Sequence, residues 1–101
     1  MVLEIRAYEI RGKHPVYQVG DQMVINRPRI LVDRTNTICV HALSTLLHYV
    51  VALDEGADPI KLGLSKDNEY AYMHCIDLGE SYIQGGNVAF KYRRMEEEPS
   101  K

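Results

Sequence analysis

The sequence is poor in cysteine, in uninterrupted apolar runs and in excess charge of one sign. Its two cysteines, Cys39 and Cys75, are too few and too far apart for the dense disulfide framework of a small secreted domain. The first residues carry charges within their apolar stretch, unlike the apolar core of a signal peptide. The longest apolar region, residues 38–53, contains histidine, serine and threonine and is too short to span a bilayer. We therefore expect a cytoplasmic protein with reduced thiols and no membrane span.

The balance of charge excludes further classes. The formal net charge is -2, and the pI is near 6.0, so the chain as a whole does not attract phosphate backbones or anionic lipid. This argues against a general nucleic-acid or membrane-surface binder, although a local basic patch remains compatible with it. With 46% apolar and 26% charged residues, the composition is that of a folded globular chain.

A chain of 101 residues is the usual size of one domain with one core. We assign residues 1–95 to a single α+β domain and residues 96–101 to an acidic, disordered tail. Alternation of apolar and polar residues, the period of a half-buried strand, predicts the strands. Pro28 leaves open whether residues 22–32 form two short strands or one bent edge strand. The predicted strands are Val2–Ile10, Gln22–Val32, Glu69–Ile76 and Asn87–Arg94.

The clearest element is a helix from about Ile38 to Glu55. Threonine and asparagine at residues 35–37 could cap its start, and Gly56 supplies a left-handed stop. At helical spacing one apolar stripe forms, and it must face the sheet. The stripe contains Cys39, Leu43, Leu46, Leu47, Val50 and Leu53. The predicted fold is therefore an antiparallel, twisted sheet or partly open barrel of roughly four to five strands, packed on one long helix.

The main candidate site is a set of thiol and imidazole side chains, the ligands preferred by zinc and iron. It consists of His14, Cys39, His74 and Cys75. Their spacing is not that of a paired zinc motif, so only the fold could bring them together. The alternatives are that both cysteines are ordinary buried thiols, or that Cys39, in the first helical turn, is a reactive redox thiol.

Other motifs give weaker support for a functional site. His41 and His48 lie about 10 Å apart along one helix, too far to share an ion. An exposed, partly polar helix face is the favoured interpretation; the alternative is a partner surface lined by Val40, His41, Ser44, Val51 and Ala52. Lys91, Arg93 and Arg94 could contact a few phosphates, as could the arginines at positions 27, 29 and 34. Only Tyr92 interleaves with the first group, so solvated strand faces are the favoured interpretation. A strand follows the glycine pair at 85–86, which favours a turn over a phosphate loop.

Three segments carry a resemblance that covers nearly the whole chain. They are the H-P-x-Y-x-V-G-D segment that begins at His14, the C-x-H-A-L run that begins at Cys39, and the G-G-x-V-x-F run that ends at Phe90. In these the chain resembles a family of small uncharacterised prokaryotic proteins, and the resemblance implies no activity. Members often carry Cys-Pro where this chain has His14-Pro15. The resemblance thus implies that His14, Cys39 and Cys75 correspond to a three-cysteine set with one thiol replaced by an imidazole.

No catalytic motif with a recognisable local context is present, so whether the protein is an enzyme stays open, with a non-catalytic role favoured. The first functional hypothesis is a small binding or interaction module, self-associating through a strand edge or the Val40/Val51 surface. The second is a zinc- or iron-dependent protein that uses Cys39 and Cys75 with His14 or His74. The third is a thiol redox protein.

Overall fold

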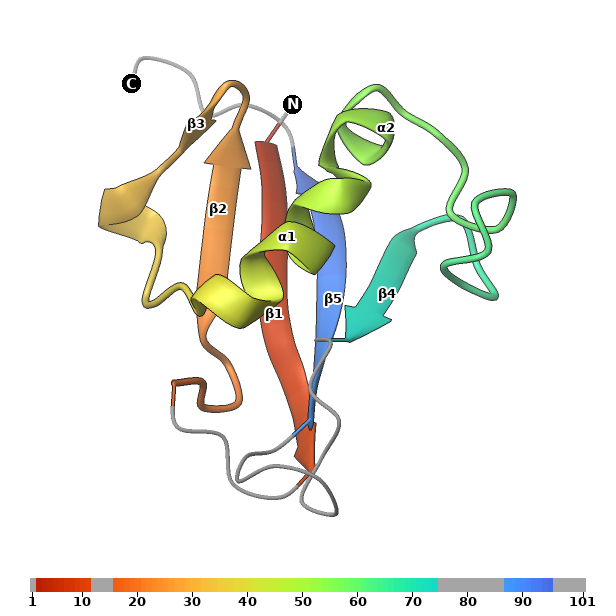
Figure 1. The fold of residues 1–101 in the computed structure, drawn as a ribbon. Helices are drawn as coiled ribbons and strands as arrows, with labels where there is room; N and C mark the ends of the chain where they lie inside the picture. Colours follow the sequence, from red (N-terminus) through yellow and green to blue (C-terminus); the bar gives the residue numbers. More distant parts are fainter. Residues whose placement is uncertain (1, 12–15, 75–86, 96–101) are drawn as a thin grey trace.

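The computed structural model describes residues 2–11, 16–74 and 87–95 of the chain (Figure 1). The strands are β1 (Val2–Arg11), β2 (Gln22–Asn26), β3 (Arg29–Ile30), β4 (Tyr70–His74) and β5 (Asn87–Met95). Between β3 and β4 lie a 3-10 turn, η1 (Val32–Arg34), and two short helices, α1 (Val40–His48) and α2 (Val50–Asp54).

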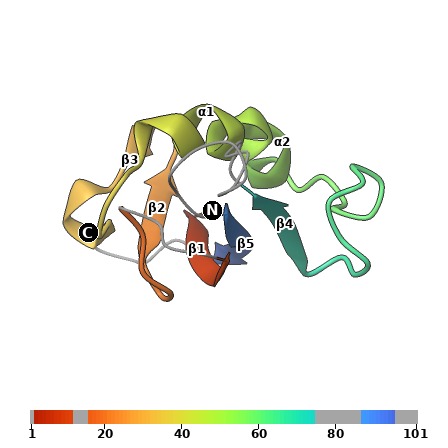
Figure 2. The ribbon, with the colours of Figure 1, turned by 60° about the horizontal axis from the view of Figure 1, so that its bottom comes forward.

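The strands form one antiparallel sheet in the order β3-β2-β1-β5-β4. The two longest strands, β1 and β5, pair along their whole length near its centre, with Ile5 opposite Tyr92. Both helices lie on the same face of this sheet (Figure 2). The α+β class and the antiparallel sheet are therefore confirmed. The partly open barrel is wrong, because the described strands do not close on one another. Of Gln22–Val32, only β2 and β3 are strand, which selects the two-strand alternative.

The prediction of one long helix over Ile38–Glu55 is wrong. Tyr49, with φ -106° and ψ 8°, interrupts the helix between α1 and α2. The hydroxyl of Tyr92 donates a hydrogen bond of 2.6 Å to the carbonyl oxygen of Leu46, in the last turn of α1. A buried partner from the sheet thus engages the backbone where the chain bends, a long-range contact that helical periodicity does not reveal. Gly56, with φ 93°, has the expected left-handed conformation just beyond α2.

The predicted cap at residues 35–37 is also wrong, because none of these residues is the N-cap of α1 and the side chains of Thr35 and Asn36 bond to the sheet. The Thr35 hydroxyl accepts a hydrogen bond from the Val24 amide, and the Asn36 side-chain oxygen accepts one from the Gln22 amide. The N-cap of α1 is instead Cys39, whose side chain makes no capping hydrogen bond. The segment before α1 therefore runs along the edge of β2.

The apolar stripe of the helices faces the sheet largely as predicted. Cys39, Leu46, Val50 and Leu53 are buried, and Leu43 packs against them in part. Leu47, by contrast, is 39% exposed, whereas Ala42, outside the predicted stripe, is fully buried. The packed surface is therefore shifted around the helix relative to the predicted one. It places Ala42 rather than Leu47 against the core residues Ala71, Val88, Phe90 and Tyr92.

Candidate functional site

The sheet has a second face, turned away from α1 and α2, which we call the outer face (Figure 2). Side chains alternate between the two faces of a strand. Phe90 and Tyr92 of β5 lie in the core, so Lys91 and Arg93, which alternate with them along the strand, point outward. Ala71 of β4 is likewise in the core, which turns Tyr70 and Tyr72 outward. The outer face therefore carries tyrosines and cations side by side.

A β-bulge in β1 adds a further tyrosine to this face. Ala7 pairs with Phe90 and Glu9 with Ala89, which leaves Tyr8 as the extra residue. The bulge reverses the alternation of β1. Beyond it Glu9, opposite outward-pointing Ala89, lies on the outer face, and Ile10 packs against the core. From the bulge onward, all four residues at the end of β1, 8–11, are exposed or partly exposed to solvent.

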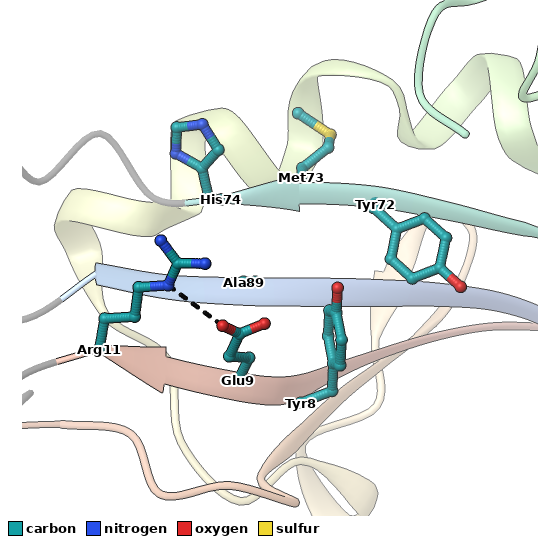
Figure 3. Close-up of a pocket in the computed structure, with 7 residues that line it drawn as sticks. All are labelled: Tyr8, Glu9, Arg11, Tyr72, Met73, His74 and Ala89. Atoms are coloured by element: carbon teal, nitrogen blue, oxygen red, sulfur yellow. Dashed lines mark hydrogen bonds and ion pairs between the residues drawn. The ribbon is translucent and has the colours of Figure 1, made fainter. Parts of the chain in front are cut away.

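The tyrosines and Lys91 form a compact cluster. The rings of Tyr8 and Tyr72 pack with their centroids 5.6 Å apart and their planes at 59° (Figure 3). The ammonium of Lys91 lies 3.9 Å from the ring centroid of Tyr70 and 6.0 Å from that of Tyr72. These are cation–π distances, so Lys91 is held over ring faces from the neighbouring strand. The cluster joins β1, β5 and β4 across the outer face.

Ionic groups flank the cluster at both ends. At one end the nearly buried carboxylate of Glu4 pairs with two arginines, at 3.2 Å from Arg6 Nε and 3.3 Å from Arg93 Nη2. At the other end Arg11 Nε lies 3.1 Å from Glu9 Oε1 (Figure 3). One carboxylate shared between Arg6 and Arg93 leaves an excess of positive charge at the first end.

Three shallow depressions lie along this face among the described residues. The first, of about 410 Å³, is shown in Figure 3 and is lined by Tyr8, Glu9, Arg11, Tyr72, Met73, His74 and Ala89. The second, of about 540 Å³, is lined by Tyr8, Gly63, Ser65, Lys66, Asp67 and Tyr72. The third, of about 240 Å³, is lined by Glu4, Arg6, Tyr70, Lys91 and Arg93. All three therefore border the tyrosine and Lys91 cluster.

The loop before β4 builds one wall of this site. Asp67 Oδ1 accepts hydrogen bonds from the amides of Tyr70 and Glu69, which hold the pKa of Asp67 below its ordinary value of 3.8, and Lys91 lowers it further. The amide of Tyr72 donates to the carbonyl of Leu64 at 2.9 Å. The free edge of β4 is thus partly occupied by its own loop, which fixes Tyr70 and Tyr72 in place.

The predicted metal ligands are only partly within the described chain. Cys39 is buried on the helix side of the sheet, where its amide donates to the Tyr17 hydroxyl at 3.0 Å. His74 follows Tyr72 in the alternation of β4 and lies at the end of the outer face (Figure 3). The sheet thus separates Cys39 from His74. His14 and Cys75 lie outside the described residues, within which no group of three or more potential metal ligands occurs.

The other predicted candidates are also placed. His48 is exposed and packs edge-on against Tyr49, with ring centroids 4.7 Å apart, whereas the side chain of His41 is not described. Of the basic group, Arg94 points to the helix side, where it donates to the carbonyls of Leu53 and Ala57. Tyr92 is buried there too, so neither residue belongs to the outer face.

Sequence reasoning missed Tyr8, Tyr70 and Tyr72 as partners of the cations. The alternation of residues 70–74 is visible in the sequence, but the strand register that sets these rings beside Lys91 is not.

No helix within the described ranges has the length and apolar character needed to cross a bilayer. In comparisons with family models, curated proteins and solved structures, no match to the chain is found.

Proposed function

We propose that this protein is a small, non-catalytic binding module and that the outer face of its sheet is the binding surface. The observation that carries this proposal is the cluster of Tyr8, Tyr70, Tyr72 and Lys91, which is bordered by depressions and left uncovered by the helices. Tyrosine supplies a large, rigid contact area together with a polar end, and such residues are enriched at binding surfaces.

Nuclear magnetic resonance tests this proposal directly. A ¹⁵N-labelled sample is titrated with defined probes: adenosine monophosphate, citrate, maltose and a short polyglutamate peptide. We expect at least one of these probes, or a single-stranded oligonucleotide such as oligo-dT, to shift the amide signals of Glu9, Tyr72 and Lys91 and to leave that of Val51 unchanged. Shifts confined to the helices, or no shift with any probe, would contradict the proposal.

Self-association through the helices is a second candidate function. Val40 is 76% exposed and Val51 57% exposed on the side of the helices away from the core, and Leu47 is partly exposed as well. The edge of β4 is a weaker candidate, because the amides of Tyr70 and Tyr72 already donate within the chain. These observations favour the helical surface over a strand edge.

Light scattering coupled to size exclusion tests this second candidate. We expect a dimer that the substitution Val51→Lys converts to a monomer, because burying a charged side chain at an apolar interface is unfavourable. The matched control is Val19→Lys, at a residue that is also exposed but lies in the turn before β2. A strictly monomeric wild type would rule the candidate out.

A further inference from the structure

We infer that the ligand of the outer face is a single-stranded polynucleotide, with bases stacked on the Tyr8/Tyr72 pair and phosphates bound by the arginines at the two ends of the face. This inference rests on the proposed function, because it names the ligand of the same surface. It concerns a local surface and is therefore compatible with the net charge of -2 of the whole chain.

Aromatic rings on the outer face are accessible to a ligand. Tyr8 is 43% exposed although it lies within a central strand. Its partner Tyr72 lines the depressions on both sides of the pair. Stacking of bases on aromatic rings is the main sequence-independent contact of proteins with single strands, since every base offers a π face. Exposed aromatic residues on an open sheet are one of the forms in which proteins present such rings.

The charge of the outer face is also complementary to that of a polyanion. The strands of the outer face present four cations, Arg6, Arg11, Lys91 and Arg93, against the carboxylates of Glu4 and Glu9 among the described residues. At the rim, Lys66 offsets Asp67. The Glu4 carboxylate is largely buried beneath both of its arginines, whose side chains remain 44% and 49% exposed. Arg93 can therefore donate to a phosphate without leaving Glu4. Arg6 also donates to the Gly20 carbonyl and the Gln22 side chain, which leaves one N–H on each of its terminal nitrogens for a phosphate.

The spacing of the charged groups selects the kind of polyanion. Arg6 and Arg11 are separated by five residue steps along β1, roughly 15 Å of strand. The tyrosine cluster lies between the two charged ends, so a ligand that reaches both must have anionic groups on either side of its aromatic groups. A mononucleotide is too short, and a duplex keeps its bases stacked inside, out of reach of a flat sheet face. A single strand meets both requirements.

Fluorescence anisotropy with labelled oligo-dT and oligo-U of about twelve nucleotides tests the inference at low salt, where phosphate contacts are strongest. We expect binding by wild type, and a loss of about tenfold or more with Tyr72→Ala or Tyr8→Ala, because each removes a stacking platform. Tyr72→Phe should bind like wild type, since it keeps the ring. Arg93→Gln should weaken binding and lower its dependence on salt, whereas the matched control Lys61→Gln, at an exposed position beyond α2, should not.

Several results would overturn the inference: no binding of either oligonucleotide, equal binding of the corresponding duplex, or equal competition by inorganic polyphosphate, which carries charge without bases. Wild-type affinity in the folded Tyr8→Ala/Tyr72→Ala double variant would do so as well. If another probe shifts the outer-face amides while the oligonucleotides fail to bind, the inference falls and the proposed function stands. If no ligand shifts these amides, both fall.

Discussion

The hydrogen bond from Tyr92 to the carbonyl of Leu46 gives the sharpest test of how the sheet and helices are joined. Tyr92 is 1% exposed, and its hydroxyl lies 2.6 Å from an oxygen in the last turn of α1. The substitution Tyr92→Phe removes the hydroxyl and keeps the ring. It leaves a buried acceptor without this donor, which costs about 1–2 kcal/mol of the free energy of unfolding. For a domain of this size that corresponds to roughly 5–10 °C in Tm.

The same residue links stability to alkaline pH. Burial raises the pKa of Tyr92 above its ordinary value of 10.0, and the neighbouring Tyr17 adds to the shift. Because the pKa of Tyr92 is higher in the folded state than in the unfolded state, the contribution of its phenol to the free energy of unfolding is complete below pH 10. This contribution is lost as the pH rises further, because only the unfolded state then releases the phenol proton. The loss is about 1.4 kcal/mol per pH unit for one proton.

Urea unfolding at pH 7 and pH 11, followed by circular dichroism, measures both effects. We expect the variant to be less stable than wild type at pH 7, and the difference between them to shrink by about 1.4 kcal/mol at pH 11. The matched control is Tyr70→Phe, the same chemical change on the outer face, which should alter stability by less than about 0.5 kcal/mol at pH 7. Equal stabilities of wild type and Tyr92→Phe at pH 7, or a constant difference between them, would refute the reasoning.

Four further predictions concern the core, the loop and the thiols. Leu46→Ala should lower the free energy of unfolding, measured in urea, by about 2–5 kcal/mol, whereas Leu47→Ala, on the exposed side of α1, should lower it by less than about 0.5 kcal/mol. Equal losses would contradict the packing of the Leu46 side of α1 against the sheet. Because backbone hydrogen bonds lower the pKa of Asp67, the ionised carboxylate should contribute fully to the free energy of unfolding above pH 3.8. That contribution should disappear as the pH falls through the lowered pKa of the folded state, and Asp67→Asn should lack this acid dependence in urea unfolding. Iodoacetamide should label buried Cys39 slowly in the folded protein and rapidly in urea, and fast labelling of the folded protein would support the redox hypothesis. If Cys39 and Cys75 share zinc or iron, untagged protein purified without chelator should contain that metal by elemental analysis and lose stability on its removal; metal-free protein with unchanged stability on adding either ion would exclude the site.

Local patterns predicted the strands better than the helix. Alternation placed β1 and β5 to within a residue or two, because a half-buried strand requires one apolar residue in two. The helical stripe identified most of the buried residues but not the interruption at Tyr49. That interruption coincides with a contact between Leu46 and Tyr92, residues 46 positions apart in the chain. A hydrophobic pattern within one segment does not reveal a helix interruption that is associated with a contact to another segment.

The candidate site was harder to predict for the same reason. Lys91 and Arg93 were recognised as a basic group, but the tyrosine assigned to them, Tyr92, is the residue that alternation sends to the core. The rings that accompany these cations come from β4 and β1, and only the register of three strands brings them together. The bulge at Tyr8 adds a reversal of faces that simple alternation predicts wrongly.

The net charge of the chain does not give the charge of one surface, for a related physical reason. A polyanion near the sheet responds to charges within about 10 Å at ordinary ionic strength, because salt screens more distant ones. The acidic residues 96–98 and Glu55 contribute to the total of -2, whereas the outer-face strands carry Arg6, Arg11, Lys91 and Arg93 against two carboxylates among the described residues. If the outer face binds a single strand, raising the salt concentration should weaken binding sharply for wild type and less for Arg93→Gln. A salt dependence that is the same in both proteins would mean that the affinity arises elsewhere on the molecule.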